Sequence, residues 1–156
     1  MRNRFAPPLV AIGLVVAVLA SSCASSQEPA TGSPPKPANG KVTVKSTETL
    51  KSDDVTNGGV SGTGHFTISG AVADAGAVTD YRTVKGNKVL IRRVVIGKKG
   101  TITFLITLYQ SASAPGKWTI TSTTRTYKGL HGNGTQVVDN YTSTPATFVL
   151  AGTVSQ

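Results

Sequence analysis

Residues 101–108 read TITFLITL, and apolar side chains alternate with threonines along most of this segment. Successive side chains of a β-strand point to opposite faces of a sheet, so the alternation predicts a strand with one buried face. Isoleucine, threonine and phenylalanine also favour strands. Between residues 41 and 156, no stretch sustains the 3.6-residue apolar period that an amphipathic helix requires.

Similar short runs lie on both sides of this segment. About eight strands are expected, near residues 41–45, 65–72, 78–84, 89–96, 101–108, 118–121, 137–138 and 148–154. Turns rich in Gly, Asn and Pro are expected between them, at residues 57–59, 85–87, 98–100, 114–116 and 132–134. Short, evenly spaced strands of this kind predict an all-β fold, either a single antiparallel eight-stranded β-barrel, which we favour, or a β-sandwich.

The predicted strand at residues 89–96, VLIRRVVI, is apolar on both faces but contains Arg92 and Arg93. Adjacent residues of a strand point to opposite faces. If both faces are buried, one arginine therefore enters the barrel and needs a carboxylate or a hydrogen-bonding partner. The alternative is an arginine at the barrel rim whose stem lets the charged group reach water.

An arginine inside the barrel could form part of a binding site, because an eight-stranded barrel is either filled by side chains or holds one small ligand. The acids available within strand-rich sequence are Asp74, Asp80 and Asp139. An inward ion pair beside a tyrosine would orient an anionic or polar ligand. The candidate lumen residues are therefore Arg92, Arg93, Asp80, Asp139, Tyr81 and Tyr109.

The chain begins with the pattern of a bacterial lipoprotein signal. Two arginines within residues 1–4 precede an uncharged apolar run at residues 9–20, and small residues lead to Cys23, the only cysteine. Twelve apolar residues are too few to cross a bilayer core, which takes about 20, and are typical of a signal peptide. The pattern predicts a signal peptide at residues 1–22 and a diacylglycerol on the thiol of Cys23.

The residues before the cysteine leave alternatives open. A lipoprotein signal usually has Leu three positions before the cysteine, whereas here Ala20 takes that place and Leu19 lies one position earlier. Cleavage after Ala24 by ordinary signal peptidase would instead give a secreted protein without lipid. An uncleaved anchor is the third alternative. We favour lipid anchoring at the extracytoplasmic face of the cell membrane.

Residues 23–40 form a predicted flexible tether, and residues 41–156 form the barrel domain. Residues 24–40, ASSQEPATGSPPKPANG, contain four prolines and no large apolar side chain, so they cannot bury enough surface to fold. In an extended polyproline-like conformation, at about 3.1 Å per residue, they would reach on the order of 50 Å. A spacer of this kind is consistent with a domain held near a membrane.

The chain carries 16 basic and 7 acidic residues, a formal net charge of +9. Removal of Arg2 and Arg4 with the signal leaves 14 basic residues against 7 acidic ones, a net charge of +7. Basic residues gather between positions 85 and 99, and we take Lys85, Lys88, Lys98 and Lys99 as candidate contacts with anionic lipid or cell-wall polymer. The alternative is that these charges only keep the surface soluble. No nucleic-acid-binding module is present, so a nucleic-acid partner is not expected.

The sequence offers little for catalysis. The two histidines, His65 and His131, are not paired at short spacing, and a lone cysteine gives no metal-ligand set. Residues 59–62 read GVSG and miss the G-x-S-x-G spacing of a hydrolase nucleophile. We therefore predict no catalytic residues, no metal and no cofactor.

Glycines and aromatic residues carry a resemblance to a known family. Residues 127–134, YKGLHGNG, follow Gly116-Lys-Trp118, and residues 62–70 read GTGHFTISG. These segments resemble the penultimate hairpin and the opening strand of small exported bacterial barrels, which are similar to plant dirigent proteins and allene oxide cyclases. The resemblance implies an eight-stranded barrel. Plant members steer a reactive intermediate or cyclise an epoxide, but no matching set of functional residues is found here.

The expected function is that of a membrane-anchored lipoprotein whose barrel is a non-enzymatic binding or structural module at the cell envelope. Its partners would be the membrane, through Cys23, and a small apolar or anionic ligand or a cell-wall polymer. Two alternatives remain open. The barrel could house an isomerase or cyclase in its lumen, or it could bind anionic envelope polymers through a basic face.

Overall fold

A computed structural model describes residues 37–51, 57–110, 115–140 and 143–156, except for the side chains of residues 138–140. Cys23, the predicted signal peptide and most of the predicted tether therefore lie outside the described residues. In the part of the chain that is described, no helix combines the length and the apolar character needed to cross a membrane.

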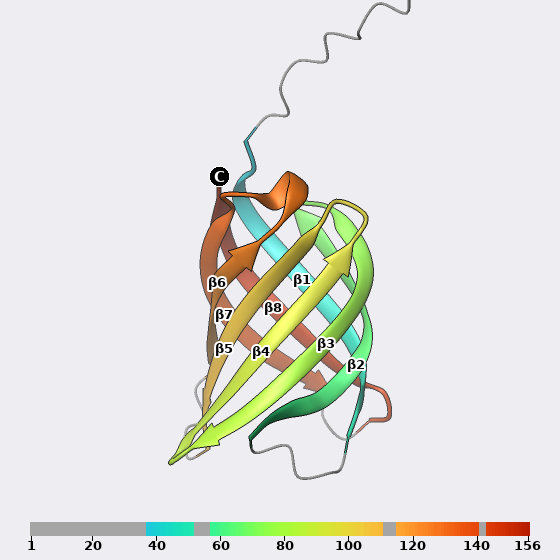
Figure 1. Cartoon of the computed structure of the whole chain (residues 1–156), viewed down its shortest axis with the longest axis vertical. Helices are drawn as coiled ribbons and strands as arrows, with labels where there is room; N and C mark the ends of the chain where they lie inside the picture. Colours follow the sequence, from blue (N-terminus) through green and yellow to red (C-terminus); the bar gives the residue numbers. More distant parts are fainter. Residues whose placement is uncertain (1–36, 52–56, 111–114, 141–142) are drawn as a thin grey trace, which may run out of the picture. The chain divides into compact units, whose positions relative to one another are not determined.

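Eight antiparallel strands close into a barrel in sequence order, with β8 paired to β1 (Figure 1). The strands are β1 (Asn39–Leu50), β2 (Asn57–Gly70), β3 (Asp74–Lys85), β4 (Lys88–Gly97), β5 (Thr101–Tyr109), β6 (Gly116–Thr123), β7 (His131–Asn140) and β8 (Ala146–Ser155). A short 3-10 helix, η1 (Arg125–Tyr127), lies between β6 and β7. The predicted eight-stranded barrel is confirmed, and the sandwich alternative is wrong.

The two ends of the barrel differ in what they carry. The start of β1, the end of β8 and η1 lie at one end, which we call the terminal end (Figure 1). The turn between β3 and β4 lies at the opposite end, which we call the hairpin end. At this turn Lys85 pairs with Lys88 around Gly86 and Asn87, and Gly86 has a φ of 57°, a conformation that suits glycine.

Two predicted turns and one boundary need correction. Residues 57–59 belong to the start of β2, where the register shifts between Asn57 and Gly59. Residues 132–134 lie within β7, and the chain turns earlier, at η1 and residues 128–130. β1 begins at Asn39, two residues before the expected start of the barrel domain at residue 41. Glycines mark both turns and close strand contacts, so their positions alone did not separate the two roles.

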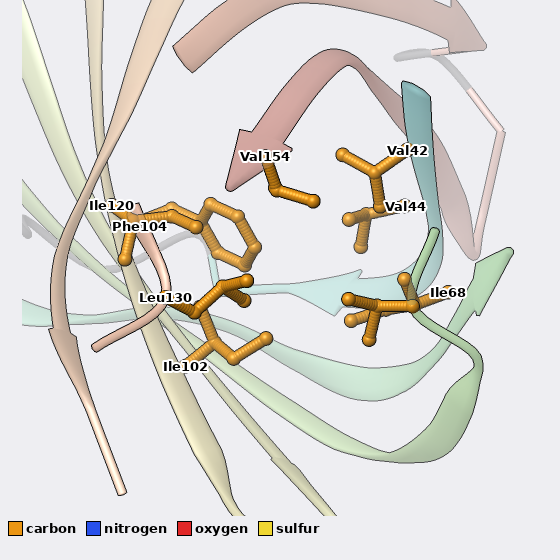
Figure 2. A pocket seen from close by; sticks show the side chains of 9 residues that line it. Val42, Val44, Ile68, Ile102, Phe104, Ile120, Leu130 and Val154 are labelled. Carbon is orange, nitrogen blue, oxygen red and sulfur yellow. The ribbon is translucent and has the colours of Figure 1, made fainter. Parts of the chain in front are cut away.

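The terminal half of the barrel interior is filled by apolar side chains. Figure 2 labels eight of the side chains that surround one small space: Val42, Val44, Ile68, Ile102, Phe104, Ile120, Leu130 and Val154. The space left between them is about 10 Å³. A cavity needs roughly 10–15 Å³ to hold a single water molecule, so this half of the interior cannot take up a ligand.

Trp118 of β6 belongs to the apolar core and contacts residues of β5, β7 and β8. Its ring meets Phe104 edge-on, with the centroids 5.4 Å apart. Its indole Nε1–H donates to the backbone oxygens of Thr135 and Ala151, at 3.1 Å and 3.2 Å. The glycine pair Gly134 and Gly152, on β7 and β8, lies against the ring and leaves it room. Trp118 is 1% exposed, and its indole N–H, the polar group of this buried side chain, is hydrogen-bonded.

Candidate functional site

Arg93 lies inside the barrel and is completely buried. It is paired in register with Asp80 on the neighbouring strand β3, and both side chains point inward. Arg93 Nε and Nη2 donate to Asp80 Oδ1 and Oδ2 at 2.9 Å and 2.7 Å. This bidentate arrangement is the strongest geometry that an arginine and a carboxylate can form.

A second carboxylate contacts the same guanidinium nitrogen, Nη2. Glu48 of β1 is also completely buried, and its Oε1 lies 2.7 Å from Arg93 Nη2. Ser46 Oγ donates to the same oxygen at 2.6 Å. β1 and β3 are separated by β2, which places Gly62 opposite Asp80. A Cβ on Gly62 would lie 2.9 Å from Glu48 Oε2, so this glycine provides the space through which Glu48 approaches Arg93.

The two carboxylates share one positive charge in a buried setting. Burial raises the pKa of Glu48 to about 7, because the attraction of Arg93 and the hydrogen bond from Ser46 only partly offset desolvation and the nearby charge of Asp80. Burial by itself lowers the pKa of Arg93. The hydrogen bonds to Asp80 and the negative charges of Asp80 and Glu48 outweigh this effect, so the pKa of Arg93 is raised overall. Arg93 therefore stays charged, whereas Glu48 can change its protonation state near neutral pH.

Polar atoms without a partner gather in the same half of the barrel. Within the described residues, the buried side-chain atoms that lack a hydrogen-bond partner are Glu48 Oε2, Arg82 Nε, Arg93 Nη1, and Oε1 and Nε2 of Gln136. Buried polar groups are almost always hydrogen-bonded in native proteins, so each exception needs an explanation. Gln136 is the clearest case, since it is 2% exposed and neither atom of its amide has a protein partner.

A pocket of about 150 Å³ opens beside these atoms at the hairpin end. Its polar lining comprises Lys51, Ser61, Asp80, Arg82 and Gln136, and its apolar lining comprises Leu50, Val89, Ile91, Leu108 and Phe148. An apolar cavity of about 150 Å³ accommodates benzene, so a molecule of that size fits here. The pocket thus combines an apolar wall with a few inward polar groups, which is the usual composition of a small-molecule site.

The structure separates the predicted lumen residues into two groups. Arg93 and Asp80 lie together inside the barrel. Arg92 and Tyr81 lie outside, where the Arg92 guanidinium carbon stands 3.9 Å above the Tyr81 ring. Tyr109 is also on the outer face and is 45% exposed. Their expected lumen positions are wrong, because period-2 alternation turns each of them away from the buried face of its strand. The side chain of Asp139 lies outside the described residues.

The other polar residues of the site were not among the residues predicted from the sequence. Ser46 and Glu48 continue the alternation of Val42 and Val44 along β1, so extending that pattern would have placed them inside. Arg82 likewise follows Val78 and Asp80 at spacing two on β3. Gln136 had no comparable signal, since the glycines before it on β7 do not reveal which face is buried.

The predicted basic cluster does not form one surface. Lys85 and Lys88 are exposed at the hairpin end, whereas Lys98 and Lys99 are exposed at the terminal end. The two pairs are separated by the length of β4, which spans about 30 Å at roughly 3.3 Å per residue. Arg93 lies inside the barrel between them. A ligand would need to be long to contact both pairs of lysines.

The terminal end carries a wider hollow of about 410 Å³, which includes Ala38, Ala71, Lys99 and Tyr127. The polar groups around it are largely engaged in holding the fold. The Tyr127 hydroxyl donates to Asp74 Oδ2 at 2.7 Å, and the backbone N–H groups of Lys98 and Lys99 donate to the same carboxylate. Burial alone would raise the pKa of Asp74, but these hydrogen bonds lower it overall. The hollow offers a ligand no unpartnered buried group among the described residues.

The histidines show no sign of a shared site. His65 is exposed on β2, and His131 contacts the backbone oxygen of Gly129 and the hydroxyl of Ser155. Within the described ranges, no three His, Cys, Asp or Glu side chains lie close enough together to hold a metal ion.

In comparisons with protein-family models, with curated proteins and with solved structures, nothing matches this chain.

Proposed function

We propose that this protein is a lipid-anchored, exported binding protein whose barrel takes up one small molecule at the hairpin end. The observation that carries the proposal is Gln136, a residue of the pocket lining whose buried amide has both of its polar atoms unpartnered. A buried amide without partners costs about 1–3 kcal/mol, and a bound molecule that supplies a donor and an acceptor would remove this cost.

A lumenal isomerase or cyclase is the second candidate, because Glu48 has a pKa near 7 and could accept and return a proton at neutral pH. Binding without chemistry is favoured by the geometry. Asp80 lines the pocket, but both of its oxygens already accept hydrogen bonds from Arg93. Glu48 is held by Arg93 and Ser46 and does not line the pocket. The likeness to dirigent-type barrels extends to shape only in this proposal.

Anchoring rests on the lipoprotein signal before Cys23. In this proposal the tether joins the barrel through Asn39, at the terminal end, so the pocket lies at the end remote from the attachment point. An extended tether of on the order of 50 Å would leave the pocket accessible to solutes outside the cytoplasmic membrane. A basic face for anionic envelope polymers is less favoured, because the lysines are divided between the two ends.

Fractionation of cells that express the native chain or Cys23→Ala tests the anchor, with Ser25→Ala as the matched control. The native protein and Ser25→Ala should remain with membranes, and the mature N-terminus should be a Cys23 that carries a lipid-sized mass increment. Cys23→Ala should lose the increment and leave the membrane fraction. Recovery of an unmodified chain that begins at Ser25 would refute the anchor.

Thermal unfolding of the detergent-extracted mature protein tests binding. Small molecules of benzene to naphthalene size, with and without polar groups, should include some that raise the melting temperature, because ligand binding stabilises the folded state by mass action. Gln136→Leu should abolish the shift, whereas Thr135→Val, an exposed neighbour on β7, should retain it. A shift of equal size in Gln136→Leu would place binding elsewhere.

A further inference from the structure

We infer that the ligand of this pocket is a small carboxylic acid in its anionic form, with an apolar body and with its carboxylate held by Arg82 and Gln136. The inference rests on the proposed binding function and adds the chemical class of the ligand. Three features of the pocket support it: the balance of charge, the free hydrogen-bonding groups and the apolar wall.

The first feature is that the uncompensated charge lining the pocket is positive. Arg93 already contacts two carboxylates, those of Asp80 and Glu48. Arg82 forms no ion pair with any carboxylate among the described residues, although its Nε is buried. Lys51 adds an exposed positive charge to the lining. A charge that is partly withdrawn from water without a partner is unfavourable, so an anion that approached Arg82 would be stabilised.

Asp80 is the one carboxylate among the described lining residues, and it does not offer an equivalent site for a cation. Both of its oxygens accept hydrogen bonds from Arg93. An ammonium group would have to compete with a bidentate, completely buried guanidinium for those oxygens. The pocket therefore favours anions and disfavours amines.

The second feature is the set of free hydrogen-bonding groups. A carboxylate needs donors, and Arg82 Nε and Gln136 Nε2 are buried, unpartnered donors of two residues that line the pocket. Ser61 also lines the pocket. Gln136 Oε1 remains as an acceptor, which a hydroxyl group on the ligand could satisfy. A neutral amide could pair with Gln136 but would leave the charge of Arg82 uncompensated.

The third feature is the apolar wall, which limits the rest of the ligand. Val89, Ile91 and Leu108 come from β4 and β5, and Leu50 and Phe148 come from β1 and β8. A volume of about 150 Å³ suits one aromatic ring or a short branched chain. The fitting class is thus a monocarboxylate with a single ring or a branched alkyl body.

Calorimetric titration of the detergent-extracted mature protein with three probes of nearly equal shape tests the inference. The probes are phenylacetate, phenylacetamide and phenethylamine. Phenylacetate should bind about tenfold or more tightly than phenylacetamide, since a charge-assisted hydrogen bond exceeds a neutral one by about 1.4 kcal/mol. Phenethylamine should bind most weakly. These comparisons use the native chain and do not depend on the folding of any variant.

Two substitutions then assign the preference to a residue. Arg82→Gln should weaken phenylacetate binding about tenfold and leave phenylacetamide binding nearly unchanged. Arg92→Gln removes the same charge from the outer face and should alter neither. A native protein that bound phenylacetamide or phenethylamine as tightly as phenylacetate would overturn the inference and leave the binding function intact. If none of the three probes bound, while an unrelated compound bound through Gln136, the inference would fail in the same way.

Discussion

Arg93 holds two carboxylates together inside a barrel whose other half is filled by apolar side chains. Its removal would leave Asp80 and Glu48 buried side by side without a counter-charge. Breaking a buried ion pair by deleting one partner typically costs about 3–5 kcal/mol, because the remaining charge stays desolvated.

We therefore expect Arg93→Met to lower the free energy of unfolding by about 3–5 kcal/mol at pH 8. The adjacent Arg92→Met, on the outer face, should change it by less than about 1 kcal/mol. Urea unfolding of the two variants, followed by the fluorescence of the only tryptophan, Trp118, provides the comparison. Equal losses in both variants would show that the buried ion pairs do not stabilise the fold.

Glu48 gives the stability of the protein a specific dependence on pH. Its pKa is about 7 in the folded chain, above its ordinary value of 4.5. Between these values the folded state binds more protons than the unfolded state, so stability falls as pH rises through this window. The contribution of Glu48 is complete below pH 4.5 and lost above pH 7, and its size is on the order of 3 kcal/mol.

Glu48→Gln should remove this dependence while Asp80 keeps its pairing with Arg93. Urea unfolding at half-unit intervals from pH 4.5 to 8 should show a falling free energy of unfolding for the native chain and a flatter profile for the variant. The variant should be the more stable of the two at pH 8. Parallel profiles for both proteins would mean that Glu48 ionises normally in the folded state.

The Arg93–Asp80 pairing could have been derived from the sequence, but the contact with Glu48 could not. A two-residue turn at Gly86 and Asn87 pairs Lys85 with Lys88, and counting back along both strands brings Asp80 opposite Arg93. Glu48 lies on a strand that is not adjacent to either residue. Its approach depends on Gly62 of the intervening strand and on the closure of the barrel, which local patterns do not specify.

At the scale of elements, β7 and β8 are fitted to Trp118 of β6. Gly134 and Gly152 pair across the two strands and face the indole ring. A Cβ on Gly152 would lie 2.5 Å from Trp118 Cζ2 and 2.8 Å from Gly134 Cα, and it would also meet the backbone oxygen of Asn133. The strands would have to move apart to accommodate any side chain there.

Gly152→Ala should therefore destabilise the barrel by about 1–3 kcal/mol, the usual cost of overpacking. The near-ultraviolet circular dichroism of Trp118 should change as well, because its ring would lose its fixed position. Ala151→Ser, an exposed neighbour on the same strand, is the control and should leave both measurements unchanged. An unchanged Trp118 signal in Gly152→Ala would contradict the proposed fit.

The same glycines explain why some element boundaries were predicted wrongly. Residues 132–134 contain two glycines around an asparagine, a composition typical of turns, yet they lie in β7 because Trp118 needs the space that glycine leaves. The strand at residues 101–108 was predicted reliably because its alternation needs no partner to be interpreted. Strand boundaries could be predicted where the pattern lies within one strand. They could not be predicted where a residue is chosen for its contacts with another strand.

At the scale of the whole molecule, the barrel divides into a packed terminal half and a hairpin half with a polar pocket. The number of strands followed from the sequence, which favoured a closed barrel over a sandwich but did not exclude the sandwich. The location of the pocket did not, because it depends on how the inward residues of eight strands align along the barrel axis. Phe104 lies in the packed half and Phe148 lines the pocket. Both side chains are buried, at 1% and 5% exposed, so the same substitution can be compared in the two halves.

Phe104→Ala should cost about 3–5 kcal/mol, since it opens a cavity among side chains that leave only about 10 Å³ free, and it removes the edge-on contact with Trp118. Phe148→Ala should lower the free energy of unfolding by at least about 1 kcal/mol less than Phe104→Ala does. It enlarges a pocket that already opens to solvent, so water can occupy the new space. Urea unfolding of both variants tests this order.

The two substitutions should also differ in their effect on binding. Phe148→Ala enlarges the pocket and should shift its preference from phenylacetate toward a bulkier acid such as naphthylacetate, whereas Phe104→Ala should leave the preference unchanged. Equal stability losses with no change in ligand size would mean that the two halves of the barrel are packed alike. The reverse order of stability would place the better-packed core at the hairpin end, where the buried ion pairs and the unpartnered amide of Gln136 lie.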